Sequence, residues 1–313
     1  MIEKAIALKH YSVMLEEVLE FLSPQPGEQF LDCTIGGAGH ASELLTRVGK
    51  EGFLWGLERD PRTLELATRR LSAVGHPFQL IHGNFADLEH WVQKFEIPQL
   101  DGILMDLGTS IFQLKEAERG FSLLSDGPLD MRMNPEENTP SAADLVNSLS
   151  ENELKQLFKE YGDERFSGRI ARWIVEAREQ TPFTRTRQLA ELVAKRLPQR
   201  DKIHPATRIF QALRIAVNQE YKALEDVLPL AVRLLKPGGK IAVISFHSGE
   251  DRRVKQAFRD MSQSCVCPPR QPICTCDTEA LLARPGKLQK PGTSEIQENP
   301  PSRSAKLRTA RRI

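Results

Sequence analysis

Short apolar segments alternate with amphipathic segments along the first third of the chain. The apolar segments have the length and composition of buried strands, and the segments between them have the spacing of helices. Strands that alternate with helices predict a parallel sheet. The expected strands are residues 29–32, 53–57, 78–82 and 100–107, and the expected helices between them include 38–47 and 61–71.

The pattern changes near residue 112. Amphipathic helices are expected at 141–148, 151–161, 165–179 and 186–196, with no strand among them, before a helix at 220–235 and a strand at 240–246 resume the alternation. We therefore predict an α/β domain formed by residues 1–111 and 218–313, with an all-helical insertion at 112–217. An insertion after the fourth strand leaves the sheet at the carboxyl ends of the strands, where such sheets bind ligands.

A glycine-rich turn follows the first expected strand. Asp32 ends the strand, and Gly36, Gly37 and Gly39 precede the expected helix, so the backbone can approach a ligand closely there. The second strand ends in Glu58, at a spacing that allows hydrogen bonds to the two hydroxyls of a ribose. This arrangement predicts a nucleotide-binding site.

The details of the turn favour one class of nucleotide. A dinucleotide fingerprint reads G-x-G-x-x-G, and the third glycine is missing here. The Asp32 carboxylate would repel a pyrophosphate but suits a ligand with an ammonium group, such as S-adenosylmethionine (SAM). A nicotinamide-dependent oxidoreductase remains the alternative, which a cofactor-binding screen would decide.

Composition indicates a soluble protein. The 313 residues are 40% hydrophobic and 27% charged, and no apolar run approaches the ~20 residues that span a bilayer. We expect a cytoplasmic protein without a membrane partner. The net charge of +1 conceals basic clusters at 164–214 and 303–312. These clusters suit a phosphate-rich partner, and solvated helix faces are the alternative. Within the first of these clusters, Arg169 and Arg172 lie one helical turn apart on the same face of a predicted helix.

Several ordered stretches give a more specific indication, because together they resemble the bacterial 16S ribosomal RNA cytosine-N4-methyltransferase family, which modifies a cytosine in the decoding centre. The resemblance runs from about residue 10 to the carboxyl terminus. The stretches are His10-Tyr-Ser-Val-Met-Leu-Glu-Glu-Val, Gly39-His40, Asp101-Gly-Ile-Leu-Met-Asp-Leu-Gly, Arg119-Gly-Phe-Ser, Asp126-Gly-Pro-Leu-Asp-Met-Arg-Met, Tyr161-Gly-Asp-Glu-Arg-Phe, His204-Pro-Ala-Thr-Arg-Ile-Phe-Gln-Ala-Leu-Arg-Ile-Ala-Val-Asn and Ile244-Ser-Phe-His-Ser.

The resemblance implies a Rossmann-like SAM-dependent methyltransferase sheet with a helical insertion, acting on 16S rRNA in the small ribosomal subunit. It also implies which residues bind SAM. These are the turn residues Ala38, Gly39 and His40, the ribose-binding Glu58, the adenine-contacting Phe85, and Asp106 and Gln113. The alternative from a different class is a non-catalytic RNA-binding assembly factor with a vestigial SAM fold.

Three positions and one stretch depart from the family pattern, and the stretch is Thr109-Ser-Ile-Phe-Gln, where the family more usually has Val-Ser-Ser-Pro-Gln. Ala38 stands where the family usually has glycine, and we expect its backbone N–H to remain available to the cofactor. Glu58 replaces the more common aspartate, and Gly249 replaces leucine. We expect these departures to affect how the substrate base is positioned at the site more than which class of reaction takes place.

The acceptor chemistry indicates a catalytic residue. The exocyclic amine of cytosine is a poor nucleophile, so the enzyme has to align it and accept a hydrogen bond from it. Asp106, at the end of the fourth strand, is the expected acceptor, with a backbone carbonyl as the rival. His247, at the end of the fifth strand, and the Asp130–Arg132 pair are candidates for contacting the substrate. A structural histidine and an internal ion pair are the corresponding alternatives.

Four of the five cysteines form a C-x-C-x6-C-x-C motif, comprising Cys265, Cys267, Cys274 and Cys276. Four thiols can close a tetrahedral zinc site, although C-x2-C is the commoner spacing. The sequence leaves open whether this cluster binds a metal. Any such site would be structural and remote from catalysis.

Overall fold

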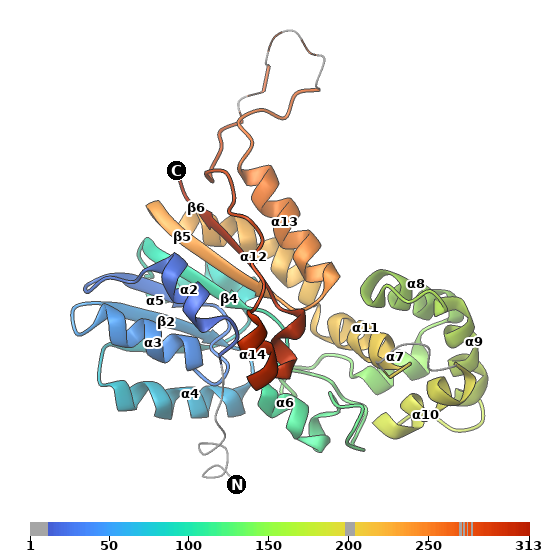
Figure 1. Cartoon of the computed structure of the whole chain (residues 1–313). Helices are drawn as coiled ribbons and strands as arrows, with labels where there is room; N and C mark the ends of the chain where they lie inside the picture. The colour runs from blue at the N-terminus through green and yellow to red at the C-terminus, as the bar shows by residue number, and fades with distance from the viewer. Residues whose placement is uncertain (1–11, 198–203, 269–270, 272, 274, 277) are drawn as a thin grey trace. The chain divides into compact units, whose positions relative to one another are not determined.

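The computed structural model describes residues 12–197, 204–268, 271, 273, 275–276 and 278–313 (Figure 1). The chain divides into two compact units. The α/β unit comprises Met1–Gly108 and Tyr221–Ile313, and the helical unit comprises Thr109–Glu220. The helical unit therefore begins three residues before the predicted insertion at 112–217 and ends three residues after it.

The α/β unit is built on a six-stranded sheet with the strand order β3-β2-β1-β4-β5-β6. Strands β1 to β5 run parallel to one another, and β6 runs antiparallel to its neighbour β5. This confirms the predicted α/β class with a Rossmann-like parallel sheet. The strands are β1 (Gln29–Asp32), β2 (Phe53–Glu58), β3 (Phe78–His82), β4 (Leu100–Asp106), β5 (Leu235–Ser245) and β6 (Lys306–Arg311).

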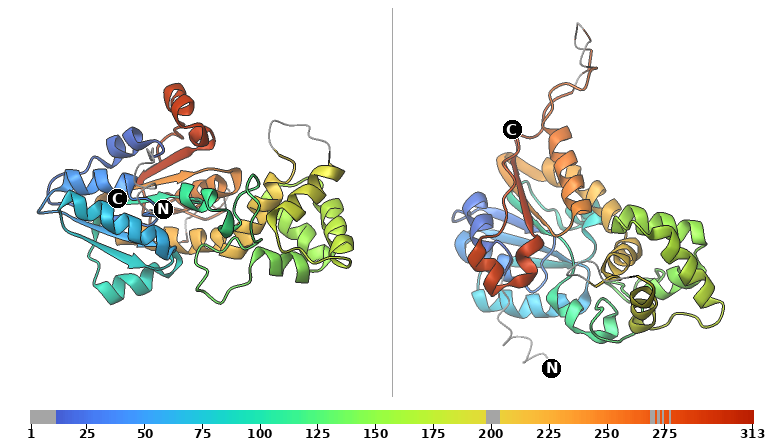
Figure 2. Two further views of the ribbon diagram at one scale, coloured as in Figure 1. Left: turned by 90° about the horizontal axis from the view of Figure 1, so that it is seen from below. Right: turned by 45° about the vertical axis from the view of Figure 1, so that its right-hand side comes forward.

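Both faces of the sheet are covered by helices (Figures 1 and 2). Neighbouring residues along a strand point to opposite faces, so Phe30 and Leu104 pack with α2, α3 and α4, whereas Leu31 and Ile103 pack with α5, α12 and α13. Burial on both faces explains why the strands are almost continuously apolar. The helices are α2 (Leu15–Leu22), α3 (Gly39–Val48), α4 (Pro61–Val74), α5 (Leu88–Phe95), α12 (Glu220–Leu234), α13 (Ser248–Met261) and α14 (Thr293–Glu298), with 3₁₀ turns η1 (Phe85–Asp87) and η3 (Pro300–Ser304).

The fifth strand begins earlier than expected. The prediction placed Pro237-Gly238-Gly239 before the strand, but β5 starts at Leu235 and includes these residues. Leu235 pairs with Leu100 and Lys240 pairs with Gly102, so the register shifts between the two pairs. Gly238 has a φ of 81°. A bulge with a glycine in the left-handed region explains how this sequence stays within a strand.

The carboxyl-terminal residues form the edge strand β6, which the hydrophobic pattern did not predict. Lys306 and Arg308 contact Asp251 at 3.0 Å and 2.6 Å. Arg312 donates hydrogen bonds to the Arg233 and Leu235 carbonyl oxygens. Three basic side chains of the 303–312 cluster therefore have partners within the α/β unit.

The helical unit has its own hydrophobic core, which includes Phe158, Ile170, Leu189 and Leu213. Its described residues contain no named strand. Across the described residues of the whole chain, no helix is both long enough and apolar enough to cross a membrane. The elements of the helical unit are α6 (Ile111–Lys115), η2 (Ala117–Arg119), α7 (Ala142–Ser148), α8 (Glu151–Gly162), α9 (Ser167–Arg178), α10 (Thr186–Arg196) and α11 (Thr207–Asn218).

Candidate functional site

The glycine-rich turn joins β1 to α3. Ala38 precedes the helix with φ 57° and ψ 32°, a left-handed conformation that costs a non-glycine residue about 1–2 kcal/mol. Its N–H donates to the Ile35 carbonyl oxygen at 2.8 Å. The expectation that the Ala38 N–H is available to a ligand was therefore wrong, because the turn already uses it. The next residue, Gly39, begins α3, and amides of a first helical turn have no acceptor within the helix.

Asp32 ends β1 and is almost completely buried. Its Oδ1 accepts hydrogen bonds from the Thr34 N–H at 2.9 Å and from the Thr34 hydroxyl at 3.3 Å. Burial raises the pKa of Asp32 to about 6, although the Thr34 hydrogen bonds act in the opposite direction. Thr34 Oγ1 also accepts a hydrogen bond from the Asp106 N–H at 2.6 Å. This threonine, which the sequence analysis missed, links the ends of β1 and β4.

Glu58 ends β2 and faces the glycine turn. Its Oε2 accepts a hydrogen bond from the Gly36 N–H at 2.9 Å, and its Oε1 accepts one from the Asp60 N–H at 2.8 Å. Burial raises the pKa of Glu58 to about 7, with the Asp60 charge acting in the same direction. A carboxylate has about four lone-pair sites, more than these backbone contacts use. Glu58 thus retains capacity to accept hydrogen bonds from ligand hydroxyls.

Asp106 ends β4, next to β1 and β5 in the sheet. Within the described residues, its Oδ1 is buried and has no hydrogen-bond partner. Burial raises the pKa of the Asp106 carboxyl well above its usual range, and the negative charges of Asp32 and Glu250 raise it further. A buried acceptor without a donor is unfavourable, which makes this oxygen a candidate for binding a ligand donor.

His40 holds the other side of Asp106. The His40 Nε2 atom lies 2.9 Å from the Val13 carbonyl oxygen, and Nδ1 lies 3.7 Å from Asp106 Oδ2. Because a carbonyl oxygen only accepts, Nε2 carries a proton and Nδ1 faces the carboxyl group. The His40 side chain is therefore positioned to orient Asp106, a role beyond its expected backbone contact.

Glu250 is a further acid that the sequence analysis missed. It lies in the first turn of α13, where its Oε2 accepts a hydrogen bond from the Phe246 N–H at 2.8 Å. His247 precedes the helix, with Nε2 3.0 Å from Glu250 Oε1 and Nδ1 3.4 Å from the Glu250 backbone nitrogen. An acid just after the end of the fifth strand was the signal that could have identified it. His247 thus caps α13, and its ring lies beside the Glu250 carboxyl group.

Three carboxyl groups consequently gather at the carboxyl ends of the adjacent strands β1, β4 and β5: Asp32, Asp106 and Glu250. Such a group suits a cationic ligand, because opposite charge offsets the repulsion among the acids. Phe85 lies in η1, just after β3, and is partly buried against the core. The structure therefore places Glu58, Phe85 and Asp106 at the ends of β2, β3 and β4.

The helical unit contains five other predicted residues, which are Gln113, Asp130, Arg132, Arg169 and Arg172. Gln113 is buried in α6, where its Oε1 accepts a hydrogen bond from the Ser110 N–H at 3.0 Å in a capping box. Arg132 donates to both carboxylate oxygens of Asp130, at 2.8 Å and 2.7 Å. Burial acts to raise the pKa of Asp130, but the Arg132 hydrogen bonds outweigh it and lower the pKa. The alternative of an internal ion pair is the arrangement found for Asp130 and Arg132.

Arg169 and Arg172 both lie on α9 with exposed side chains. The Arg169 guanidinium stacks 4.4 Å from the centre of the Phe166 ring. Arg172 lies 3.7 Å from Glu151, but 65% of its side chain is exposed. An exposed ion pair of this kind is weak, so it competes poorly with a polyanion.

Comparisons with known proteins agree with this geometry. The model of the MraW methylase family matches residues 7–313. A protein of Syntrophotalea carbinolica named ribosomal RNA small subunit methyltransferase H is 53% identical, over 97% of this chain and 98% of its own length. Proteins with the same name in Trichlorobacter lovleyi and Geobacter sulfurreducens are each 48% identical, over 97% and 98% of this chain and 98% and 100% of their own lengths. These matches confirm the predicted relationship and the expected enzyme class, and they show that the chain belongs to the MraW methylase family.

Proposed function

We propose that this protein transfers a methyl group from SAM to the exocyclic N4 of a decoding-centre cytosine in the 16S rRNA of the small ribosomal subunit. The names of the relatives support the class of reaction and the small-subunit RNA. The observation that supports the site of reaction is the buried, unpartnered Oδ1 of Asp106 at the end of β4. A non-catalytic assembly factor would not require an acid with a strongly raised pKa in this position.

The residues present fit the cofactor. When bound, SAM supplies a methyl group made electrophilic by the positive sulfonium. Glu58 accepts hydrogen bonds from the two ribose hydroxyls, and Phe85 contacts the adenine. The amides of Gly39 and His40 face the cofactor from the first turn of α3. Asp32, Asp106 and Glu250 supply the negative charge that a sulfonium and an ammonium group require.

Asp106 then acts on the acceptor amine. Its Oδ1 accepts a hydrogen bond from the N4 amine, which localises the nitrogen lone pair and orients it toward the methyl group. N4 has to lose one proton when it is methylated, and Asp106 is the residue that would accept this proton. The His40 ring lies beside Oδ2, with Nδ1 3.7 Å away, and so limits how the carboxyl group can turn. The raised pKa of Asp106 suits this role, because it makes the carboxylate a stronger base.

The helical unit, which extends the predicted 112–217 insertion by three residues at each end, binds the RNA in this proposal. Arg169 and Arg172 are exposed on one helix and contact phosphates, while the shape of the RNA supplies specificity. In the same unit, the Asp130–Arg132 pair contacts the substrate. Gln113 is a further contact to the cofactor. The target base must be unpaired or flipped to reach the methyl group. Because the proposed substrate is ribosomal, we propose that the reaction takes place in the cytoplasm.

Methyl transfer from tritiated SAM to 30S subunits that lack the modification tests this function. We expect tritium in N4-methylcytidine after the RNA is digested to nucleosides, and little transfer by the Asp106→Asn variant. Subunits that already carry the modification are the matched control substrate. Label in another nucleoside would overturn the assignment of N4, and an absence of transfer with intact SAM binding would favour the non-catalytic alternative.

A further inference from the structure

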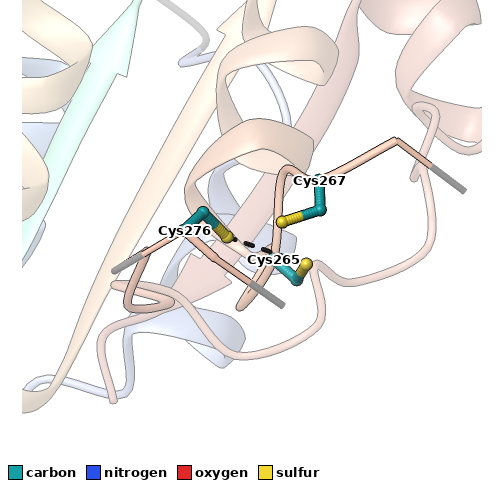
Figure 3. Close-up of side chains that lie close together, drawn as sticks. All are labelled: Cys265, Cys267 and Cys276. Atoms are coloured by element: carbon teal, nitrogen blue, oxygen red, sulfur yellow. Dashed lines mark hydrogen bonds between the residues drawn. The ribbon is translucent and has the colours of Figure 1, made fainter. Parts of the chain in front are cut away.

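Three cysteine side chains converge in the segment that follows α13 (Figure 3). The Sγ atoms of Cys265, Cys267 and Cys276 all lie within 4.8 Å of one another. Cys265 and Cys267 come from one arm of the segment, and Cys276 comes from the other. The fourth cysteine of the motif, Cys274, lies outside the described residues.

The sulfur spacing fits a metal site better than a disulfide. The Cys276 and Cys265 Sγ atoms are 3.7 Å apart. A disulfide requires a bond of about 2.05 Å. A tetrahedral site with zinc–sulfur bonds of about 2.3 Å places its sulfur atoms about 3.8 Å apart, which matches the observed separation.

Backbone amides also point at the sulfur atoms. The Val266 N–H donates to Cys276 Sγ at 3.4 Å, and the Thr275 N–H donates to Cys267 Sγ at 3.5 Å. Each of these hydrogen bonds joins one arm to the other. Such bonds stabilise thiolates, which are the form that binds metals.

Apolar packing does not hold this segment. Val266 and Ile273 have 61% and 75% of their surfaces exposed, and the described residues between α13 and Leu282 form no helix or strand. At its base, the segment is closed by hydrogen bonds from the Leu281 and Leu282 N–H groups to the Met261 carbonyl oxygen. A segment with little apolar burial needs another source of order.

We propose that Cys265, Cys267 and Cys276 bind one structural zinc ion that joins the two arms of the segment after α13. Thiolate ligands select zinc, iron–sulfur clusters or copper(I) over hard cations. Four-coordinate zinc suits the tetrahedral spacing of these sulfur atoms. From Glu250 to the end of α13 at Met261 the helix rises by about 17 Å, and the cluster lies beyond that end, so the metal takes no part in methyl transfer.

Metal analysis of the full-length protein, purified without chelators from zinc-supplemented cells, tests the proposal. We expect about one zinc per chain, and less than a tenth of that in each of the variants Cys265→Ser, Cys267→Ser and Cys276→Ser. Ser264→Ala, an exposed change beside the first ligand, is the matched control and should retain the metal. SAM affinity should be unchanged in every variant, which shows that the α/β unit is still folded.

Cobalt substitution provides an independent readout. Replacing zinc with cobalt should give the intense visible absorption of a tetrahedral thiolate site, and each cysteine variant should lose it. Wild-type protein without metal, with all of its cysteines reacting as thiols, would overturn the proposal. A Cys265–Cys276 disulfide in protein kept under reducing conditions, or an iron–sulfur chromophore, would overturn it as well.

Discussion

Replacing Glu58 with glutamine tests the electrostatics of the cofactor site. In the cofactor-free protein, burial raises the pKa of Glu58 from 4.5 to about 7. The folded protein therefore binds a proton here that the unfolded chain releases at a lower pH. The associated stability is fully present below about pH 4.5 and is lost as the pH rises to about 7. A shift of roughly 2.5 units, at about 1.4 kcal/mol per unit, corresponds to about 3 kcal/mol.

Glutamine is neutral at every pH, so Glu58→Gln removes this pH dependence. Asp32 and Asp106 titrate in both proteins, so the difference between wild type and variant isolates Glu58. Between pH 6 and pH 7 we expect the free energy of unfolding of the wild type to fall by about 1 kcal/mol more than that of the variant. Urea denaturation at half-unit steps of pH measures this difference. Glu89→Gln, at an exposed position on α5, is the matched control.

The same group should make cofactor binding depend on pH in the opposite direction. Two ribose hydroxyls donate to an ionised Glu58 better than to a neutral one, so the affinity of the wild type for SAM should increase as the pH rises toward 7. Glu58→Gln should bind SAM about 10- to 100-fold more weakly, the scale of hydrogen bonds to a charged group. Parallel pH profiles of stability would refute the raised pKa of Glu58, and unchanged SAM affinity by calorimetry would refute its assignment to the ribose.

Three further changes test other parts of the molecule. Asp106→Asn should fold but lose turnover by on the order of 100-fold, and near-normal methyl transfer would exclude the proposed proton acceptor. Replacing Arg169 and Arg172 with alanine should weaken 30S binding, reduce its log–log salt slope by roughly 0.7–0.9 per lost contact and spare SAM affinity; an unchanged slope would place both residues outside the RNA interface. Gly249→Ala should destabilise the protein by about 1–3 kcal/mol in urea denaturation, because the added Cβ would lie 1.8 Å from the Tyr221 hydroxyl. Combining it with Tyr221→Phe should recover part of that loss, and additive effects would refute the steric explanation.

The helices of the insertion were predictable because their signals are local. The amphipathic pattern placed α7, α8, α9 and α10 within about two residues of their observed bounds. Ser141 and Ser150 close capping boxes at the starts of α7 and α8, so the residues that begin these helices are visible in the sequence. Local propensity and apolar spacing agree in these segments.

The edge strand β6 was not predictable in this way. Lys306, Arg308 and Arg311 interrupt its apolar positions, and as a sequence the segment resembles a basic tail. Its place in the sheet depends on pairing with β5, about 60 residues earlier in the chain, and on the contacts of Lys306 and Arg308 with Asp251. A pattern confined to one segment contains no information about such a partner.

In the candidate site, too, some residues were predictable from local sequence signals and others depend on the fold. Asp32, Glu58 and Asp106 were identifiable because each is an acid directly at the end of an apolar run. Glu250 and Thr34 were not, because their roles arise from the strand order that sets β1, β4 and β5 side by side. The departure at Gly249 also becomes intelligible only in three dimensions. Tyr221 occupies the space that a side chain at position 249 would need. The Arg253 guanidinium stacks 3.5 Å from the centre of the Tyr221 ring.

The acids of the site lead to one conclusion about stability and binding together. Asp32, Glu58 and Asp106 all have pKa values raised chiefly by burial, so ionising any of them destabilises the cofactor-free protein. A ligand with a sulfonium and an ammonium group favours the ionised forms that burial disfavours. SAM should therefore stabilise the protein most where the cofactor-free form is weakened by ionisation, and its binding should release protons. The arrangement that makes Asp106 basic enough to accept a proton from N4 is thus the one that couples cofactor binding to the stability of the α/β unit.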